Sequence, residues 1–205
     1  SNGKAIPSKM EEVLTLLQSI KGYSLAARVR DNFISEKQLA SPEIMFSVLF
    51  LRPNLTHSMD LYYGAWAVLD PTRNMVDAFE CTDGKPWGES PLTVRPDESI
   101  LYGNNDALKK AERAKMFMNR DRRLYESVNH SMMANFASDG WKDEEVQVNE
   151  SNNKGPTGFS ALKYIQPTDV TPGYSTVSDA DVIVLRYAHV LLMIAEAENE
   201  AHGPT

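Results

Sequence analysis

Three aromatic side chains stand close together in this sequence, and their chemistry suits a sugar ligand. Tyr62, Tyr63 and Trp66 lie in one glycine-containing stretch. Sugar rings present flat faces of C–H groups, against which an aromatic ring can stack while polar neighbours bond the hydroxyls. Arg73 and Asn74 follow the cluster and could supply those hydrogen bonds. Core packing is the favoured interpretation of any single ring, and the group of three is the preferred candidate if the chain binds a glycan.

Two further tryptophans could serve the same purpose. Trp141 follows Asp139-Gly140 in a strongly polar stretch, and Trp87 follows Lys85-Pro86. We include Trp141 among the candidate glycan-binding residues because exposed aromatic rings on loops are the physical signature of such sites.

The carboxylates near this region do not indicate a hydrolase. Hydrolysis of a glycosidic bond needs two carboxylates about 5 to 9.5 Å apart, one on each side of the bond. The stretch from Asp77 to Asp83 could be mistaken for such a pair. Asp83-Gly84 is better interpreted as a turn, in which the aspartate bonds its own backbone and glycine supplies a positive φ. We therefore expect no catalytic residue.

Other reactive side chains have structural interpretations as well. The run from Arg120 to Arg123 could bind an anion, but a local ion-pair network that fixes a loop is the favoured interpretation. Cys81 has no second thiol to pair with, so we expect a buried structural thiol. No metal and no cofactor is expected, because metal-ligand spacing is absent from the four histidines, His57, His130, His189 and His202.

Composition narrows the possible partners. The chain has 205 residues, 42% of them hydrophobic, which is enough for one substantial core or part of a larger one. Its net charge of −7 repels phosphate backbones, so nucleic-acid binding is not expected. A neutral polymer such as a polysaccharide meets no such repulsion. No apolar run reaches the roughly 18 residues of a membrane span.

Helical patterns appear near both ends of the chain. Residues 8–20 carry apolar side chains on one helical face, with Ser8 and Glu11 as a possible capping box. A shorter helix is expected over residues 25–33, and the apolar run 43–50 has the length of a strand.

The middle and the end of the chain differ sharply. From residue 54 to about 177 the sequence is rich in Gly, Pro, Asn and Asp, which predicts long loops with short ordered stretches at 74–79, 106–117 and 124–128. Residues 184–201 predict a strongly apolar helix that stops at Gly203-Pro204. Since no helix follows it, we expect a truncated polypeptide, or a partner helix in a missing upstream segment.

Three segments, in order, resemble signatures of the SusD/RagB family. The stretch from Pro71 to Pro86, with Asp77-Ala78-Phe79-Glu80 and Thr82-Asp83-Gly84 inside it, is similar to a turn that runs into "lvDaFe-tDGkp". The stretch 119–125 resembles "nRDpRLy", and 185–200 resembles the helix "lRyAevLLmyAEAlNE". The departures are an arginine at 122 where proline is usual, a histidine at 189 where glutamate is usual, and a cysteine at 81 where an apolar residue is common.

The resemblance implies a mainly α fold, with tetratricopeptide-like helical scaffold elements and a long irregular region. Residues 1–205 would then be part of a single SusD-like domain, an internal or C-terminal fragment of a longer protein. Residues 1–53 would supply scaffold helices and a short extended run, 54–177 the loop-rich ligand side, and 178–205 a scaffold helix.

The resemblance also implies a function without catalysis. Such a protein would bind oligosaccharide or polysaccharide on the bacterial outer membrane, held by an N-terminal lipid anchor that this chain lacks. It would act with a TonB-dependent transporter of the SusC type during nutrient uptake. Two alternatives stay open: a peptide-binding component like the RagB branch, and a tetratricopeptide-like scaffold that acts only through protein contacts.

Overall fold

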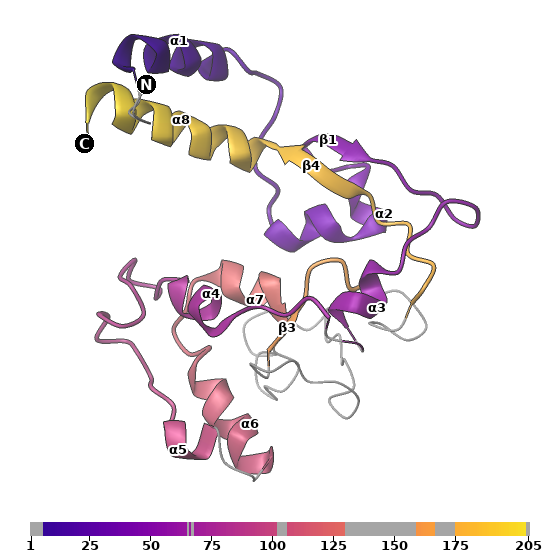
Figure 1. Ribbon diagram of the computed structural model, residues 1–205, viewed down its shortest axis with the longest axis vertical. Coiled ribbons are helices and arrows are strands. Elements are labelled where there is room, and N and C mark those ends of the chain that lie inside the picture. The colour runs from indigo at the N-terminus through magenta and orange to yellow at the C-terminus, as the bar shows by residue number, and fades with distance from the viewer. Residues whose placement is uncertain are drawn as a thin grey trace. The chain divides into compact units, whose positions relative to one another are not determined.

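The computed structural model describes residues 6–64, 66, 68–101, 106–129, 159–166 and 175–203. The chain divides into two compact units. The first joins the residues up to Leu49 with those from Asp181 onward, and the second runs from Phe50 to Ala180. In the described parts of both units helices are the main regular structure, accompanied by short two-stranded sheets (Figure 1). The expectation of a mainly helical fold with long irregular segments is confirmed.

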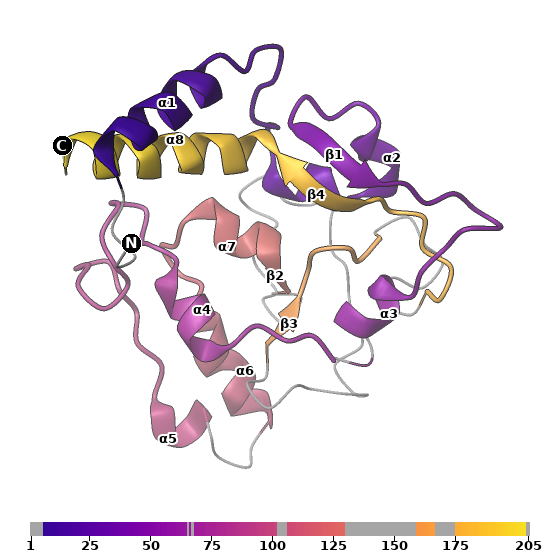
Figure 2. The ribbon, with the colours of Figure 1, turned by 45° about the horizontal axis from the view of Figure 1, so that its top comes forward.

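The first unit is built on an antiparallel helix pair. Helix α1 (Pro7–Gln18) lies along α8 (Tyr187–His202), as both views show (Figures 1 and 2). At one end the Tyr187 ring stacks near that of Tyr23, with centroids 6.3 Å apart. At the other end His202 Nε2 lies 3.5 Å from a carboxylate oxygen of Glu11. The last helix therefore has its partner within this chain, and the expectation of a partner in a missing segment was wrong.

Both helices of this pair begin differently from the sequence expectation. Helix α1 has Ile6 as its N-cap and Pro7 in its first turn, so the predicted capping box of Ser8 and Glu11 is absent. Proline suits that position because its φ is already helical and its missing N–H has no intrahelical partner there. Helix α8 begins at Tyr187, three residues later than predicted, because the preceding residues form a strand.

That strand pairs with the strand predicted within the apolar run 43–50. Strand β1 (Ile44–Val48) runs antiparallel to β4 (Val182–Arg186), with Val48 opposite Val182 and Ser47 opposite Ile183. The β-branched side chains of β4 favour this extended conformation over a helix, which explains the later start of α8.

A buried carboxylate holds the first unit together. Glu43 is 2% exposed, and its Oε1 accepts a hydrogen bond from Nη1 of Arg186 at 2.7 Å. Its Oε2 accepts from the backbone N–H of Ala26 and from Nδ2 of Asn32, each at 2.9 Å. Because the Ala26 amide bonds this side chain instead of a helical carbonyl, the helix predicted for 25–33 is reduced to a 3₁₀ turn, η1 (Val29–Phe33). Helix α2 (Ser35–Gln38) follows.

The described part of the second unit consists of short elements around a main apolar core, beside a smaller cluster of Leu162 and Ile165. Side chains of the core include Val76, Trp87, Phe117, Leu124 and Phe159. The elements are α3 (Met59–Tyr63), α4 (Arg73–Ala78), α5 (Glu98–Leu101), α6 (Asp106–Lys115), α7 (Arg122–Ser127), and a sheet of β2 (Val128–Asn129) with β3 (Ser160–Ala161). The short ordered stretches predicted at 74–79, 106–117 and 124–128 coincide to within a few residues with helices α4, α6 and α7, although the sequence pattern did not specify their helical type.

The arginine-rich motif fixes this core, in part as predicted. Asp121 caps α7 and pairs with Arg123 at 2.8 Å, and Arg122 pairs with Glu126 at 3.0 Å. Arg120 behaves differently, because it is buried and bonds backbone carbonyls rather than a carboxylate. Its guanidinium donates to the carbonyl oxygens of Met116, Val76 and Phe79, at 2.6, 2.6 and 2.8 Å.

The Asp83-Gly84 dipeptide forms the predicted turn. Gly84 has a φ of +76°, and Asp83 Oδ1 accepts the backbone N–H of Lys85 at 3.2 Å. Asp83 Oδ2 accepts from the Ser90 hydroxyl at 2.9 Å, so this carboxylate is committed to the loop. Cys81 is 2% exposed, which agrees with a buried structural thiol.

Candidate functional site

Helix α3 is anchored so that one face points inward and Tyr62 points outward. Asp60 is fully buried, and its Oδ1 accepts the backbone N–H of Gln166 at 3.1 Å. His57, just before the helix, accepts the Met59 amide at Nδ1 and therefore donates from Nε2 to the Ala180 carbonyl, 2.7 Å away. These bonds tie a five-residue helix, too short to be stable alone, to two distant segments of the second unit.

The structure brings Tyr62 and Trp66 together on the surface. Their ring centroids are 5.9 Å apart and the ring planes are inclined at 45°. Tyr62 is 40% exposed and Trp66 is 54% exposed, so both residues are accessible to solvent. The backbone holds the pair, since the Trp66 amide bonds the Leu61 carbonyl at 3.1 Å and the Val68 amide bonds the Tyr62 carbonyl at 2.9 Å. We call Tyr62 and Trp66 the aromatic pair.

Tyr63 plays a supporting part. It packs against Leu162 and Ile165, and its ring centroid lies 6.0 Å from that of Tyr164. Burial raises the pKa of the Tyr63 hydroxyl above its usual value. Tyr63 thus fixes α3 to the segment 159–166 while the aromatic pair lies at the surface.

The polar candidates lie on the next helix. Arg73, in the first turn of α4, directs its guanidinium to Asp77 at 2.9 Å and to Glu98 at 3.2 Å. Its guanidinium carbon also lies 5.7 Å from the centre of the Trp87 ring. Asn74 is exposed on the same helix. Trp141 lies outside the described residues.

Sequence reasoning missed Asp70, four residues after Trp66. Both of its carboxylate oxygens are shielded from solvent, and they have no hydrogen-bond partner among the described residues. Burial raises the pKa of Asp70 to about 6. An aspartate before a proline is ordinarily a turn residue, so the sequence holds no signal for this burial.

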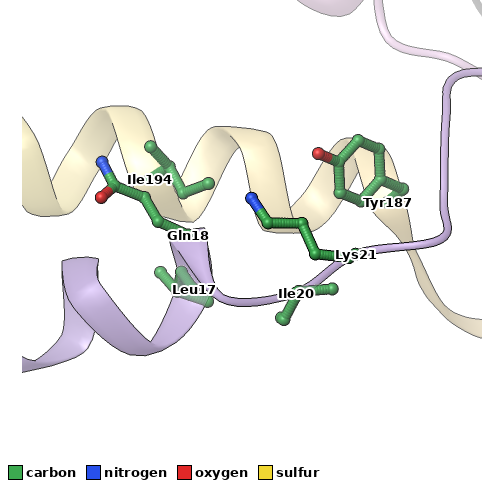
Figure 3. Close-up of a pocket in the computed structure, with 6 residues that line it drawn as sticks. All are labelled: Leu17, Gln18, Ile20, Lys21, Tyr187 and Ile194. Carbon is green, nitrogen blue, oxygen red and sulfur yellow. The ribbon is translucent and has the colours of Figure 1, made fainter.

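The described residues also line two hollows. One, of about 430 Å³, lies along α4 and is lined by Met75, Ala78, Phe79, Glu80 and Arg123. The other, of about 400 Å³, is a groove between α1 and α8 in the first unit (Figure 3). Figure 3 shows the Lys21 side chain extended along α8 between Ile194 and Tyr187. Neither hollow had a sequence signal, since each depends on how two elements meet.

Metal and membrane features were searched in the same parts of the chain. Among the described residues no cluster of three or more His, Cys, Asp or Glu side chains is placed to hold a metal ion. Within those residues, too, no helix combines the length and apolar character needed to cross a membrane.

Comparison with known proteins relates the chain to one family. The sequence pattern of the SusD family matches residues 42–205. No curated protein matches the chain. Among solved structures, a SusD-like carbohydrate binding protein from Bacteroides fragilis superposes with a TM-score of 0.60 at 18% identity, over 95% of this chain and 36% of that one. A SusD-like protein from the same organism superposes with a TM-score of 0.54 at 22% identity, over 95% of this chain and 41% of that one.

These likenesses show a shared fold, and the chain spans 36% and 41% of the lengths of the two proteins. The family match covers most of the sequence, including the three signature segments and strand β1. The chain therefore belongs to the SusD family.

Proposed function

We propose that this protein binds oligosaccharide or polysaccharide without catalysing a reaction on it. Two facts support the proposal: membership of the SusD family, and similarity in fold to a protein described as carbohydrate binding. The observation that carries it is the aromatic pair, two exposed aromatic residues whose ring centroids lie 5.9 Å apart.

The physics of sugar recognition explains why the aromatic pair would contribute more to affinity than a single polar contact. Sugar hydroxyls are already bonded to water, so each new hydrogen bond contributes only about 0.5–1.5 kcal/mol net. Stacking buries apolar C–H surface at roughly 25 cal/mol per Å² and also orients the ring. Tyr62 and Trp66 would supply the stacking surface and Tyr63 its support, with Arg73, Asn74 and Trp141 as further glycan-binding candidates.

Location and partner belong to the same proposal, and membership of the family supports them. The protein would act at the bacterial cell surface, attached to the outer membrane by a lipid anchor, and would pass its glycan to a SusC-like TonB-dependent transporter. Residues 1–53 and 178–205 would serve as scaffold and residues 54–177 as the ligand side.

Affinity electrophoresis against plant, host and microbial glycans tests the proposal. We expect at least one neutral polysaccharide in the gel to retard the protein, compared with a non-binding reference protein of similar size. Incubation with the retarding glycan should release no reducing ends. Free migration through every glycan gel would contradict glycan binding, and released reducing ends in a hydrolase-free preparation would contradict the non-catalytic assignment.

A second candidate function rests on the first unit. The groove between α1 and α8, of about 400 Å³, and the exposed side chains of Leu16 and Leu192 favour a protein contact of the tetratricopeptide kind. A peptide ligand like that of the RagB branch would be a related case. Retention of a peptide library, together with free migration in all glycan gels, would favour this class.

A further inference from the structure

We propose that His57 is a positioning residue for the aromatic pair, and that only its neutral ring, with the proton on Nε2, holds Tyr62 and Trp66 in the arrangement that binds glycan. This role rests on the proposed function and deepens it. We expect glycan affinity to fall when the His57 ring gains its second proton.

Two hydrogen bonds assign the protons of the His57 ring. The backbone N–H of Met59 can only donate, so Nδ1, 3.1 Å away, accepts and carries no proton. The Ala180 carbonyl can only accept, so Nε2, 2.7 Å away, carries the proton and donates. A doubly protonated imidazole donates from both nitrogens, and it would set an N–H group against the Met59 amide. The observed geometry therefore requires the neutral ring.

Backbone bonds and two aromatic rings keep the His57 side chain in place. The N–H and the carbonyl of His57 both bond Ser178, at 2.9 and 3.0 Å. The Phe50 ring lies edge-on to the imidazole at a centroid distance of 4.6 Å, and the Tyr164 ring does so at 6.5 Å. Because the ring is confined in this way, a second proton displaces the start of α3 rather than the imidazole.

Short backbone hydrogen bonds connect Met59 to the aromatic pair. Met59 is the first residue of α3, and the Tyr62 amide closes the first turn on the Ser58 carbonyl at 3.1 Å. The Trp66 amide bonds the Leu61 carbonyl, also at 3.1 Å. A helix of five residues has too few internal bonds to hold its own first turn. Displacement of Met59 therefore passes to Leu61 and Tyr62 and changes the placement of both rings.

Charged groups lie on the segments around His57, but none that the structure describes pairs with its ring. These groups are Arg52, Asp60, Lys163 and Asp179. Arg52 and Asp179 lie 3.3 Å from each other instead. In the described part of the chain no carboxylate thus favours the protonated imidazole by an ion pair. Tyrosine phenols, such as that of Tyr164, ordinarily ionise at about pH 10, above the range in which histidine titrates.

The pH profile of glycan affinity tests the role of His57. The probe is the neutral polysaccharide that most retards the protein in the electrophoresis panel, because its own charge does not change with pH. Histidine ordinarily changes its charge between about pH 5 and pH 8. Calorimetric titrations should therefore show at least threefold weaker binding at about pH 5.5 than at about pH 7.5. In the glycan-free protein, nitrogen NMR of the imidazoles should show the Nε2–H tautomer of His57 at about pH 7.5.

His57→Asn separates this titration from other effects of acid. The asparagine oxygen can accept the Met59 amide two residues further on, as in an Asx turn, and it does not titrate. The difference in affinity between the two pH values should therefore vanish. His57→Phe keeps an aromatic ring but has no acceptor, so it should bind more weakly than the unaltered protein at both pH values. His202→Asn, which removes a histidine from the other unit, is the matched control and should retain the pH difference.

Asp70 needs a control of its own, because its pKa of about 6 lies in the same pH range. Asp70→Asn in the unaltered protein and in each variant removes that contribution, and melting curves at both pH values should show every protein folded. Any contribution of Asp60 would survive in His57→Asn, since that variant keeps Asp60.

The outcomes separate the role of His57 from glycan binding itself. Equal affinity at the two pH values in the Asp70→Asn protein, or a pH difference that persists in His57→Asn, would overturn the positioning role while glycan binding stands. A proton on Nδ1 instead of Nε2 at about pH 7.5 would overturn it as well. Absence of binding at both pH values would overturn the proposed function, and the positioning role with it.

Discussion

The guanidinium carbon of Arg120 lies 5.2 Å from the centre of the Trp87 ring, and both side chains are buried in the core of the second unit. Two further arginines, Arg73 and Arg95, have their guanidinium carbons 5.7 and 5.3 Å from the same ring centre. Burial lowers the pKa of Arg120 from its ordinary value. Arg120 is therefore a buried cation that contacts three carbonyl oxygens and an indole ring. These contacts explain the structural role of two of the signature segments.

Arg120→Met should therefore destabilise the protein strongly. The substitution leaves three carbonyl oxygens, those of Met116, Val76 and Phe79, without their donor. Unsatisfied buried acceptors cost about 1–3 kcal/mol each, so we expect a loss of roughly 3 kcal/mol or more in the free energy of unfolding by urea titration. Arg123→Gln removes an exposed ion pair from the same motif and should cost less than about 1 kcal/mol. Equal losses in the two variants would contradict this role for Arg120.

Glu43→Gln should destabilise the first unit. Glu43 accepts from Arg186, Ala26 and Asn32, and it is almost completely buried. The glutamine keeps the shape but cannot balance the arginine charge, so we expect a loss of roughly 2–4 kcal/mol in thermal or urea unfolding. Glu11→Gln, at an exposed position on α1, is the control and should change stability by less than about 1 kcal/mol. An unchanged midpoint for Glu43→Gln would show that the carboxylate does not hold this unit.

Asp70→Asn should stabilise the protein at neutral pH and have no such effect in acid. The folded-state pKa of about 6 lies above the ordinary value of 3.8, so the folded protein binds this proton more tightly than the unfolded chain. The cost of the shielded charge is absent below about pH 3, where both states are protonated, and nearly complete above about pH 6.5. The difference in pKa corresponds to an upper limit of roughly 3 kcal/mol, and because solvent screens this partly exposed carboxylate we expect about 1 kcal/mol at pH 7.5.

Melting temperatures of Asp70→Asn and of the unaltered protein, measured between about pH 4 and pH 7.5, check the sign of this change in stability. Asp97 is the contrasting control, because hydrogen bonds from Ser99 lower the pKa of its carboxyl. Asp97→Asn should destabilise at neutral pH, with the difference lost as the pH falls. A destabilising Asp70→Asn at pH 7.5 would mean that the carboxylate has a compensating partner in solution.

The sequence was a good guide wherever local pattern decides structure. The amphipathic run of α1, the strand β1 and the Asp83-Gly84 turn follow from periodicity and turn chemistry. For α4, α6 and α7 the sequence indicated only short ordered stretches, without their helical type. It failed where tertiary contacts override local preference. Glu43 draws away the Ala26 amide and prevents a helix, and pairing with β1 holds residues 182–186 extended although the pattern from 184 onward is helical.

The candidate site was predictable in part. Clustering in sequence brought Tyr62 and Trp66 to attention, but their spacing could not reveal that Tyr63 faces the interior while its neighbour is exposed. Nor could it reveal that Arg73 is engaged with two carboxylates, or that the carboxylate oxygens of Asp70 are shielded from solvent, because both depend on segments distant along the chain or on the path of the backbone.

Trp66→Ala tests the central claim most directly. Trp66 is 54% exposed, and Phe46, an exposed aromatic residue of β1 in the other unit, serves as a matched control at 59% exposure. Calorimetric titration with the glycan that retards the protein should show Trp66→Ala weakened by roughly 1–3 kcal/mol, with the double variant Tyr62→Ala, Trp66→Ala weaker still. Phe46→Ala should bind like the unaltered protein, and all the variants should retain its circular dichroism. Normal glycan affinity in a well-folded double variant would contradict the aromatic pair as the binding surface.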